Sequence, residues 1–255
     1  MRLHLVVTRL LVRRRGHVGR CDSVPSRVVA HARGEQMSEL IRRQRQSLSD
    51  LLEGLTPVQW DAETLCAGWD AGDIAAHLVV REREPLAGPG ILLPGPFQAF
   101  TRRRQLAWKA RGRDAVLRAL RAGPPWPLSG PLGNGQVVED WIHEQDVRRG
   151  GAQAGPGESA PQLGPLLWVA AKRFASRTLA VGDLVVELTD GERRHRLTAQ
   201  RWLPIARETD APASVTITGP AGELLLYAAG RRGAGVTITG DPSARHTLAA
   251  VKRSV

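Results

Sequence analysis

The residues of this chain best suited to chemistry lie in one short stretch, 138–147, which contains Glu139, His143 and Asp146. If this stretch is helical, spacings of four and three residues put the three side chains on one face. A catalytic zinc ion usually takes three protein ligands and keeps one position open, and a carboxylate and an imidazole on adjacent turns would supply two of them. Solvated i, i+4 pairs of this kind also occur on helices without a metal, so the pair alone leaves both interpretations open.

The best candidate for a third ligand is His77, two turns into another predicted helix. Asp70 and Asp73 have the spacing of a capping box at the start of that helix. His77 lies on the side of Ile74 and Leu78, which indicates that it points toward the interior. A histidine in that position is either a ligand or a hydrogen-bonded core residue.

The elements that must position these residues are helices with long loops between them, as far as about residue 178. The periodicity of apolar residues and the positions of Pro and Gly predict helices at about 40–55, 71–84, 97–122 with a break near Gly112, and 136–149, and one through Trp168 and Phe174. Four or five amphipathic helices form a bundle, and bundles build metal sites from facing helices.

From about residue 180 the pattern changes to short strands. Two predicted strands, 184–188 and 195–198, flank the turn dipeptide Asp190-Gly191. The sequence VTITG at 215–219 returns at 236–240 around a helical segment, 223–231. This predicts a small α+β domain with a right-handed β–α–β crossover, followed by a helix after Asp241-Pro242. The two histidines of this region, His195 and His246, are expected at the surface.

The first 36 residues differ from the rest in composition. They hold eight Arg against two acidic residues, a net charge of +6 out of +11, so the other 219 residues carry +5. Their order of charged and apolar residues is wrong for a signal peptide. We therefore expect a non-structured leader over 1–36, or a segment upstream of a true start at Met37, then a bundle over 37–178 and an α+β domain over 180–255.

Composition also argues against several classes of protein. No apolar run approaches the roughly 18 residues that a membrane span needs, and no basic stripe is interleaved with aromatic residues that could stack on bases. The two cysteines, Cys21 and Cys66, make no disulfide framework and are typical of the cytoplasm. Cys66 precedes the helix of His77 and could approach the site or serve as a small buried hydrophobe.

Three segments together resemble a known family. The segments 64–69, 73–82 and 143–149 are similar to those of the mycothiol-dependent maleylpyruvate isomerases, and more closely to an uncharacterised actinobacterial metal-binding branch of that family. The resemblance runs from Met37 nearly to the end of the chain. It implies a DinB-like four- or five-helix bundle that binds one divalent metal ion, followed by a small sterol-carrier-like α+β domain.

The resemblance also implies a ligand set of His77, Glu139 and His143, with zinc as the expected metal. In the close branch a second histidine usually comes directly after the one that corresponds to His143, and this chain has Glu144 at that position. Adjacent helical residues point about 100° apart, so we do not expect Glu144 to displace His143. Asp146 could orient an imidazole from behind or act as a ligand itself.

The family is thought to activate mycothiol at the metal for isomerisation or transfer. A thiol that enters the open position of a zinc site loses its proton, because the metal stabilises the thiolate. The sequence identifies neither the electrophilic substrate nor a general acid or base. Two functions therefore stay open, an isomerase or transferase that uses a small thiol, and a metal-dependent binding or sensing protein without turnover.

Overall fold

The computed structural model describes residues 26–88, 95–125, 133–151, 155, 161–200, 206–251 and 253. The chain forms two compact units, Met1–Glu35 and Gln36–Val255. Of the leader expected over residues 1–36, residues 1–25 lie outside the described residues. The domain boundaries expected at 37, 178 and 180 stay predictions.

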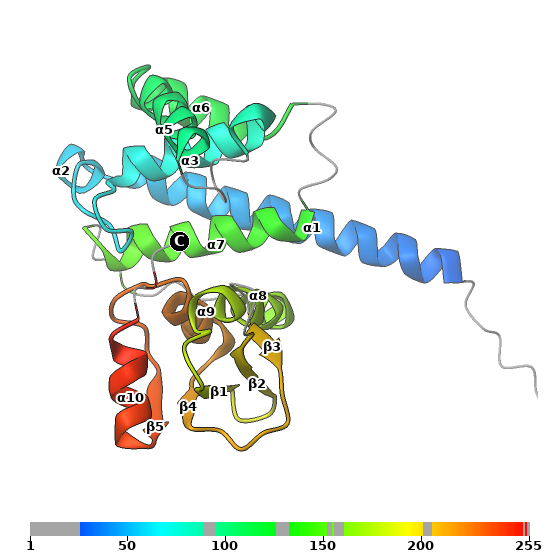
Figure 1. Ribbon diagram of the computed structural model, residues 1–255. Helices are drawn as coiled ribbons and strands as arrows, with labels where there is room; N and C mark the ends of the chain where they lie inside the picture. Colours follow the sequence, from blue (N-terminus) through cyan, green and yellow to red (C-terminus); the bar gives the residue numbers. More distant parts are fainter. Residues whose placement is uncertain are drawn as a thin grey trace, which may run out of the picture. The chain divides into compact units, whose positions relative to one another are not determined.

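From Ser26 to Thr178 the described chain is built from helices, with β-structure only later (Figure 1). In chain order the helices are α1 (Ser26–Gly54), α2 (Pro57–Trp60), α3 (Ala71–Arg83), the 3-10 helix η1 (Pro85–Ala87), α5 (Pro96–Lys109), α6 (Arg113–Ala122), α7 (Gly133–Arg149), the 3-10 helix η2 (Pro161–Leu163) and α8 (Gly164–Thr178). This mainly helical part confirms the predicted bundle.

The local signals in the sequence set several of these helix ends. The capping box at the start of α3 is present, because the side chains of Asp70 and Asp73 each accept a hydrogen bond from the other's backbone N–H. The helix predicted over 97–122 is broken as expected, since Gly112 has a φ of 85° between α5 and α6.

One helix begins earlier than the sequence predicts. The helix expected after Met37 starts at Ser26, so residues 26–36, predicted as part of a non-structured leader, are helical. The segment behind Pro25 contains no further proline and several good helix formers, including Ala30 and Ala32, so nothing local stops the helix at Met37.

The remaining residues form a mixed five-stranded sheet with two further helices. Its members are β1 (Val185–Thr189), β2 (Arg194–Ala199), β3 (Ala206–Glu208), β4 (Val215–Thr218), α9 (Ala221–Ala228), β5 (Thr237–Gly240) and α10 (Pro242–Ala249). The strand order is β3-β2-β1-β4-β5, with β1 and β4 parallel and the other pairs antiparallel. The predicted α+β class of this C-terminal part is confirmed.

The predicted β–α–β crossover is wrong, because β4 and β5 pair antiparallel, with Ile217 opposite Ile238. The reason lies in the loop after α9, which returns the chain to the start of that helix. The backbone N–H of Gly235 donates to the carboxylate of Glu223 in the first turn of α9, at 2.6 Å. Strand β5 therefore starts beside the end of β4 and runs back along it.

The expected surface position of His195 is also wrong, whereas His246 is exposed as predicted. His195 is only 8% exposed and its Nδ1 lies 3.0 Å from a carboxylate oxygen of Glu208 on the neighbouring strand. A histidine on a strand that pairs on both sides is covered by its neighbours, which a single-sequence pattern does not reveal.

Helix α7 belongs to both hydrophobic cores of the second unit. One core joins α1, α3 and α6 and includes Val147 of α7, and the other joins α7, α8, α9 and the sheet through Trp141 and Ile142. Gly222 of α9 permits the close approach, because a Cβ at that position would lie 2.6 Å from the Trp141 ring. Helix α7 is thus packed between the helical part and the C-terminal part.

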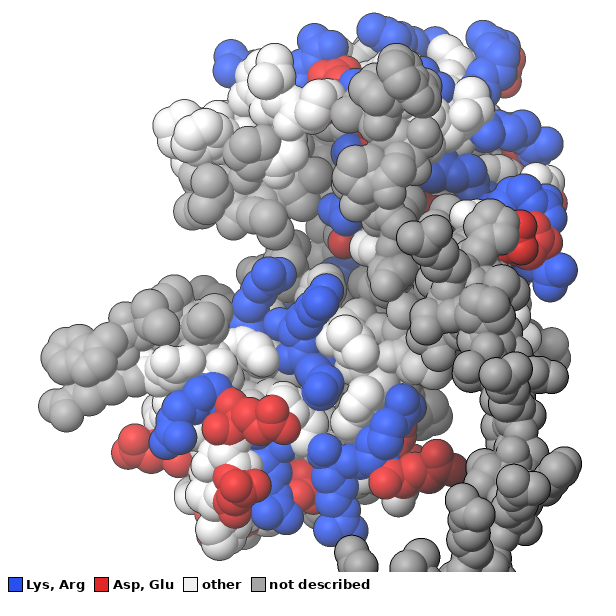
Figure 2. Space-filling view, turned by 90° about the vertical axis from the view of Figure 1, so that its right-hand side faces the viewer, with Lys and Arg blue, Asp and Glu red and all other residues white. Residues whose placement is uncertain are grey.

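Several charged side chains form ion pairs where the structure describes them. On the face drawn in Figure 2, acidic side chains lie beside many of the basic ones. Arg104 pairs with Glu84, and Lys109 lies 2.6 Å and 2.8 Å from the carboxylates of Asp70 and Asp73. In the part of the chain that the structure describes, no helix has the length and apolar character required to cross a membrane.

Candidate metal centre

The structure brings together the three residues predicted as ligands, His77 on α3 and Glu139 and His143 on α7. One potential ligand atom from each lies within 4.8 Å of the other two. Both histidines turn Nε2 toward the same carboxylate oxygen, Glu139 Oε2, at 4.0 Å from His77 and 3.7 Å from His143. The histidines are 7% and 4% exposed, and one fifth of the Glu139 side chain is exposed.

This donor set suits a divalent ion. Zinc binds imidazole nitrogen and carboxylate oxygen at about 2.0–2.2 Å, so two ligands of one ion cannot lie more than roughly 4.4 Å apart. The distances from Glu139 Oε2 to the two imidazole nitrogens are within that limit. Two neutral imidazoles and one carboxylate are also a ligand combination typical of catalytic zinc.

Trp69 forms one wall of the site. Its ring lies 5.1 Å from the ring of His77 and 6.3 Å from that of His143, centroid to centroid, and is nearly parallel to the latter at 17°. The loop that carries Trp69 is joined to the end of α7, because Leu65 N–H donates to Asp146 O at 3.0 Å. The indole therefore covers both imidazoles from a fixed position and limits their access to water.

A polar group lies behind each imidazole. The side-chain amide of Gln105, on α5, is 2.8 Å from Nδ1 of His77. The carboxylate of Asp146 is 3.0 Å from Nδ1 of His143, on the side of that ring away from Glu139. Nδ1 of His143 donates to the carboxylate of Asp146, which leaves the lone pair of that ring's Nε2 free for a metal. At His77 the nearby atom is the amide nitrogen of Gln105, which donates, so Nδ1 is the acceptor there. Metal binding through Nε2 of His77 requires the amide to turn its oxygen toward Nδ1.

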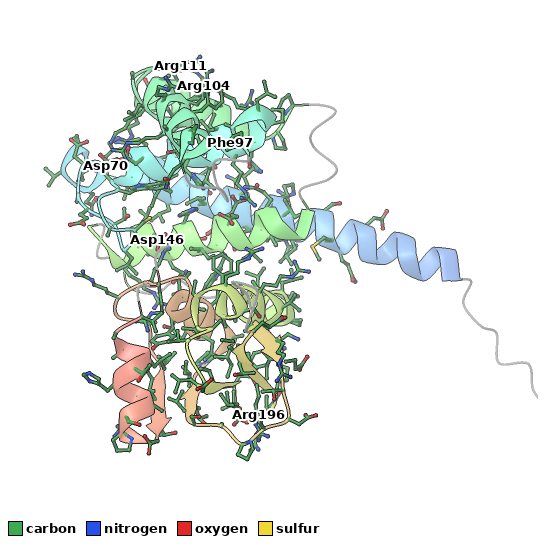
Figure 3. The ribbon with its side chains drawn as sticks, viewed as in Figure 1. Asp70, Phe97, Arg104, Arg111, Asp146 and Arg196 are labelled. Carbon is green, nitrogen blue, oxygen red and sulfur yellow. The ribbon has the colours of Figure 1, made fainter. Side chains whose placement is uncertain are left out.

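Asp146 also binds the C-terminal part. Arg231 donates from Nε to Oδ1 at 3.0 Å and from a terminal nitrogen to Oδ2 at 2.9 Å. Asp146, labelled on α7 in Figure 3, has a fully buried side chain. Both oxygens are thus held by Arg231 and His143, and the cluster of potential ligands consists of the other three residues.

The charges around the centre favour the protonation states that a metal needs. Burial lowers the pKa of His77, which keeps its imidazole neutral. Burial alone would raise the pKa of Glu139, but its contact with His77 and the charge of Arg81 lower it to about 2. Burial likewise opposes ionisation of Asp146, and the hydrogen bonds with His143 and Arg231 outweigh it and lower its pKa.

Two other residues near the site, Cys66 and Glu144, are in surroundings that do not favour metal binding. Burial raises the pKa of the Cys66 thiol to about 11, so the free thiol stays protonated near neutral pH. Glu144 faces α1, where it accepts hydrogen bonds from Gln44 at 2.5 Å and Ser47 at 2.9 Å. Its position agrees with the expectation that it does not compete with His143.

Three residues of the site were missed by the sequence analysis. Gln105 and Arg231 lie 28 and 85 residues from their partners, and no local spacing relates them. Arg81 is on the same helix as His77, at i+4, and lies 3.6 Å from the second oxygen of Glu139. That spacing was a usable signal, since it puts Arg81 on the face of His77.

The chain is similar to known proteins over its helical part and in its fold. Residues 41–87, which include His77, match the family model described as Mycothiol maleylpyruvate isomerase N-terminal domain. No curated protein matches the sequence.

Two solved structures have the same fold. One is the crystal structure of a His-to-Ala mutant of the mycothiol-dependent maleylpyruvate isomerase, with a TM-score of 0.55, and the other is the crystal structure of that isomerase, with a TM-score of 0.53. Each is 18% identical and covers 80% of this chain and 92% of its own. The predicted resemblance is therefore confirmed: the chain matches the mycothiol maleylpyruvate isomerase N-terminal domain over residues 41–87 and has the fold of the mycothiol-dependent maleylpyruvate isomerase.

Proposed function

We propose that this protein is a metal-dependent isomerase or transferase that uses a low-molecular-weight thiol, mycothiol, on an electrophilic small molecule. The observation that carries the proposal is the convergence of two imidazole Nε2 atoms on one carboxylate oxygen, at 4.0 and 3.7 Å. The similarity to an isomerase that depends on mycothiol supports the choice of thiol.

In this proposal His77, Glu139 and His143 hold one divalent ion, most often zinc. Such an ion supplies Lewis acidity at its open position, which lowers the pKa of a thiol from its usual value near 8.5. The partial exposure of the Glu139 side chain supports an approach for the thiol from solvent at that edge of the site.

The protein's own groups prepare the site for this chemistry. Asp146 keeps a proton on Nδ1 of His143, so that Nε2 of this ring is the metal-binding atom. The Gln105 amide has the same role toward His77 once its oxygen, in place of the nitrogen that lies 2.8 Å from Nδ1, faces that ring. Trp69 covers the two rings and excludes water from that side. A dry site strengthens every charge interaction within it.

The first test is metal content. Purified protein should hold about one zinc per chain, and His77→Ala and His143→Ala should each lose most of it, because two remaining protein ligands bind zinc weakly. His246→Ala is the matched control, since His246 is exposed and far from α3 and α7 in sequence. Retention of zinc by both ligand variants would reject the site.

The second test concerns the thiol. With cobalt in place of zinc, mycothiol should produce a thiolate-to-metal charge-transfer absorption at a pH well below 8.5, and its S-methyl analogue should not. If metal binds to the wild-type protein but no thiol changes its spectrum, the protein is a metal-dependent binding or sensing protein without this activity.

A further inference from the structure

We infer that Arg231, from the C-terminal part, positions the ligand His143 through Asp146 and thereby sets the metal affinity of the site. The inference rests on the proposed metal centre. It assigns a part in that centre to a residue that is not a ligand and comes from the sheet-bearing part of the chain, and it makes the C-terminal part a determinant of metal binding.

The contacts form a continuous chain from Arg231 to the imidazole. The guanidinium donates to both oxygens of Asp146, and Oδ2 of the same carboxylate is 3.0 Å from Nδ1 of His143. The third nitrogen of the guanidinium donates to the backbone oxygen of Ala229 at 2.8 Å. Only 11% of the Arg231 side chain is exposed, so the pair is shielded from water and salt.

The end of helix α9 fixes the position of Arg231. The N–H of Gly230 bonds to Tyr227 O at 3.0 Å and that of Arg231 to Leu226 O at 2.9 Å, which is a Schellman motif. Gly230 has a φ of 78°, and a Cβ there would lie 1.6 Å from Arg253 O, so only glycine fits. The backbone that presents Arg231 therefore has little freedom to move.

Removal of Arg231 would leave a buried carboxylate without its counter-charge. Such a carboxylate is costly, and it responds by taking up a proton, by turning toward water or by admitting water. Each response weakens the hydrogen bond between Nδ1–H of His143 and the Asp146 carboxylate, and with it the fixed orientation of the His143 ring. Loss of a carboxylate partner behind a ligating histidine typically lowers metal affinity by about 10- to 100-fold.

The chain offers a matched control. Arg149 on α7 also pairs with a carboxylate across to α9, at 2.6 and 3.1 Å from the two oxygens of Glu223. Its side chain is 16% exposed, close to that of Arg231. Arg149 makes no hydrogen bond to any of the three candidate ligands among the described contacts, so its loss tests the link between α7 and α9 alone.

The experiment measures zinc dissociation constants by chelator competition for the wild-type protein, Arg231→Met, Arg231→Lys and Arg149→Met, with melting temperatures of the metal-free forms. Arg231→Met should bind zinc about 10- to 100-fold more weakly, and Arg149→Met should change the affinity by less than about threefold. Arg231→Lys keeps the charge but cannot form the bidentate contact, so its zinc affinity should lie between those of Arg231→Met and Arg149→Met. It also replaces Arg231→Met if that variant does not fold.

A double variant separates positioning from general destabilisation. If Arg231 acts through Asp146, Asp146→Asn with Arg231→Met should bind zinc no more weakly than Asp146→Asn alone. If the two substitutions lower zinc affinity independently, so that the double variant shows the product of both losses, the inference is overturned. It is also overturned if Arg231→Met binds zinc as tightly as the wild-type protein, or if Arg149→Met loses as much affinity as Arg231→Met. Failure of the proposed function looks different, because the wild-type protein itself would then bind no zinc.

Discussion

The side-chain amide of Gln105 on α5 lies 2.8 Å from Nδ1 of His77 on α3. The corresponding nitrogen of His143 faces a carboxylate, Asp146, at 3.0 Å. The two histidines of the site are therefore held from behind by groups of different charge. A carboxylate makes an imidazole a stronger base than a neutral amide does, so the two supports should contribute unequally to metal affinity.

Gln105→Leu should weaken zinc binding by about tenfold, the lower end of the range for such supporting residues. The reason is that metal-bound His77 carries its proton on Nδ1 and needs the amide oxygen of Gln105 as the acceptor, which leucine removes. Gln98→Leu is the control, since Gln98 is exposed on the same helix. The expectation would be contradicted by equal zinc affinities of the two variants in chelator competition.

Glu144→Ala should lower stability without changing metal binding. Glu144 accepts hydrogen bonds from Gln44, Ser47 and Arg148. Its removal leaves the buried amide of Gln44 and the half-buried hydroxyl of Ser47 without this acceptor. We expect a loss of about 1–3 kcal/mol in the free energy of unfolding of the metal-free protein. Urea titration measures this loss, and a parallel fall in zinc affinity would mean that Glu144 supports the site after all.

Asp140→Asn should stabilise the protein at high pH. Burial raises the pKa of Asp140 to about 7, with Arg45 acting against the shift and Glu82 in its favour. Between about pH 4 and pH 7 the folded state holds a proton that the unfolded state has lost, so this group reduces stability as the pH rises. The asparagine variant has no such charge to bury.

We therefore expect the free energy of unfolding of Asp140→Asn to exceed that of the wild-type protein by roughly 1–4 kcal/mol near pH 8. The difference should shrink to less than half near about pH 5, where folded Asp140 is protonated. Urea titrations with a chelator at both pH values test this. A pH-independent difference would assign the effect to hydrogen bonding instead of charge.

A chain that begins at Met37 should melt within about 2 °C of the full chain, since buried residues far from a deletion keep their contacts. Among the side chains that the structure describes, all members of the two hydrophobic cores lie after that residue. The boundary between the compact units falls at Glu35 and Gln36. Calorimetry on both proteins measures the difference. A drop of several degrees would show that residues 1–36 stabilise the rest.

Much of the site could be predicted because its residues lie on two helices with strong local signals. The capping pair Asp70 and Asp73 fixes where α3 begins, and that start determines which face carries His77. The i, i+4 spacing of Glu139 and His143 needs only a helix to bring both side chains to one side.

The groups behind the ligands could not be predicted in this way. Gln105 reaches His77 because α5 packs on α3, and Arg231 reaches Asp146 because α9 ends next to α7, and both are facts of tertiary packing. The antiparallel return of β5 was missed for a similar reason. The repeated VTITG sequence gives two strands but not their direction, which the loop over 229–236 decides.

The separation of 85 positions between Asp146 and Arg231 is also a separation in time during synthesis. A ribosome that adds about 5–20 residues per second makes Arg231 roughly 4–17 s after Asp146. During that interval the helices that carry His77, Glu139 and His143 have already been synthesised, while the arginine behind Asp146 does not yet exist. Since we infer that Arg231 sets the zinc affinity, a nascent chain can bind zinc weakly at first. It binds zinc tightly only after α9 has been synthesised and has packed against α7. The order of synthesis thus delays tight metal loading until the C-terminal part is in place.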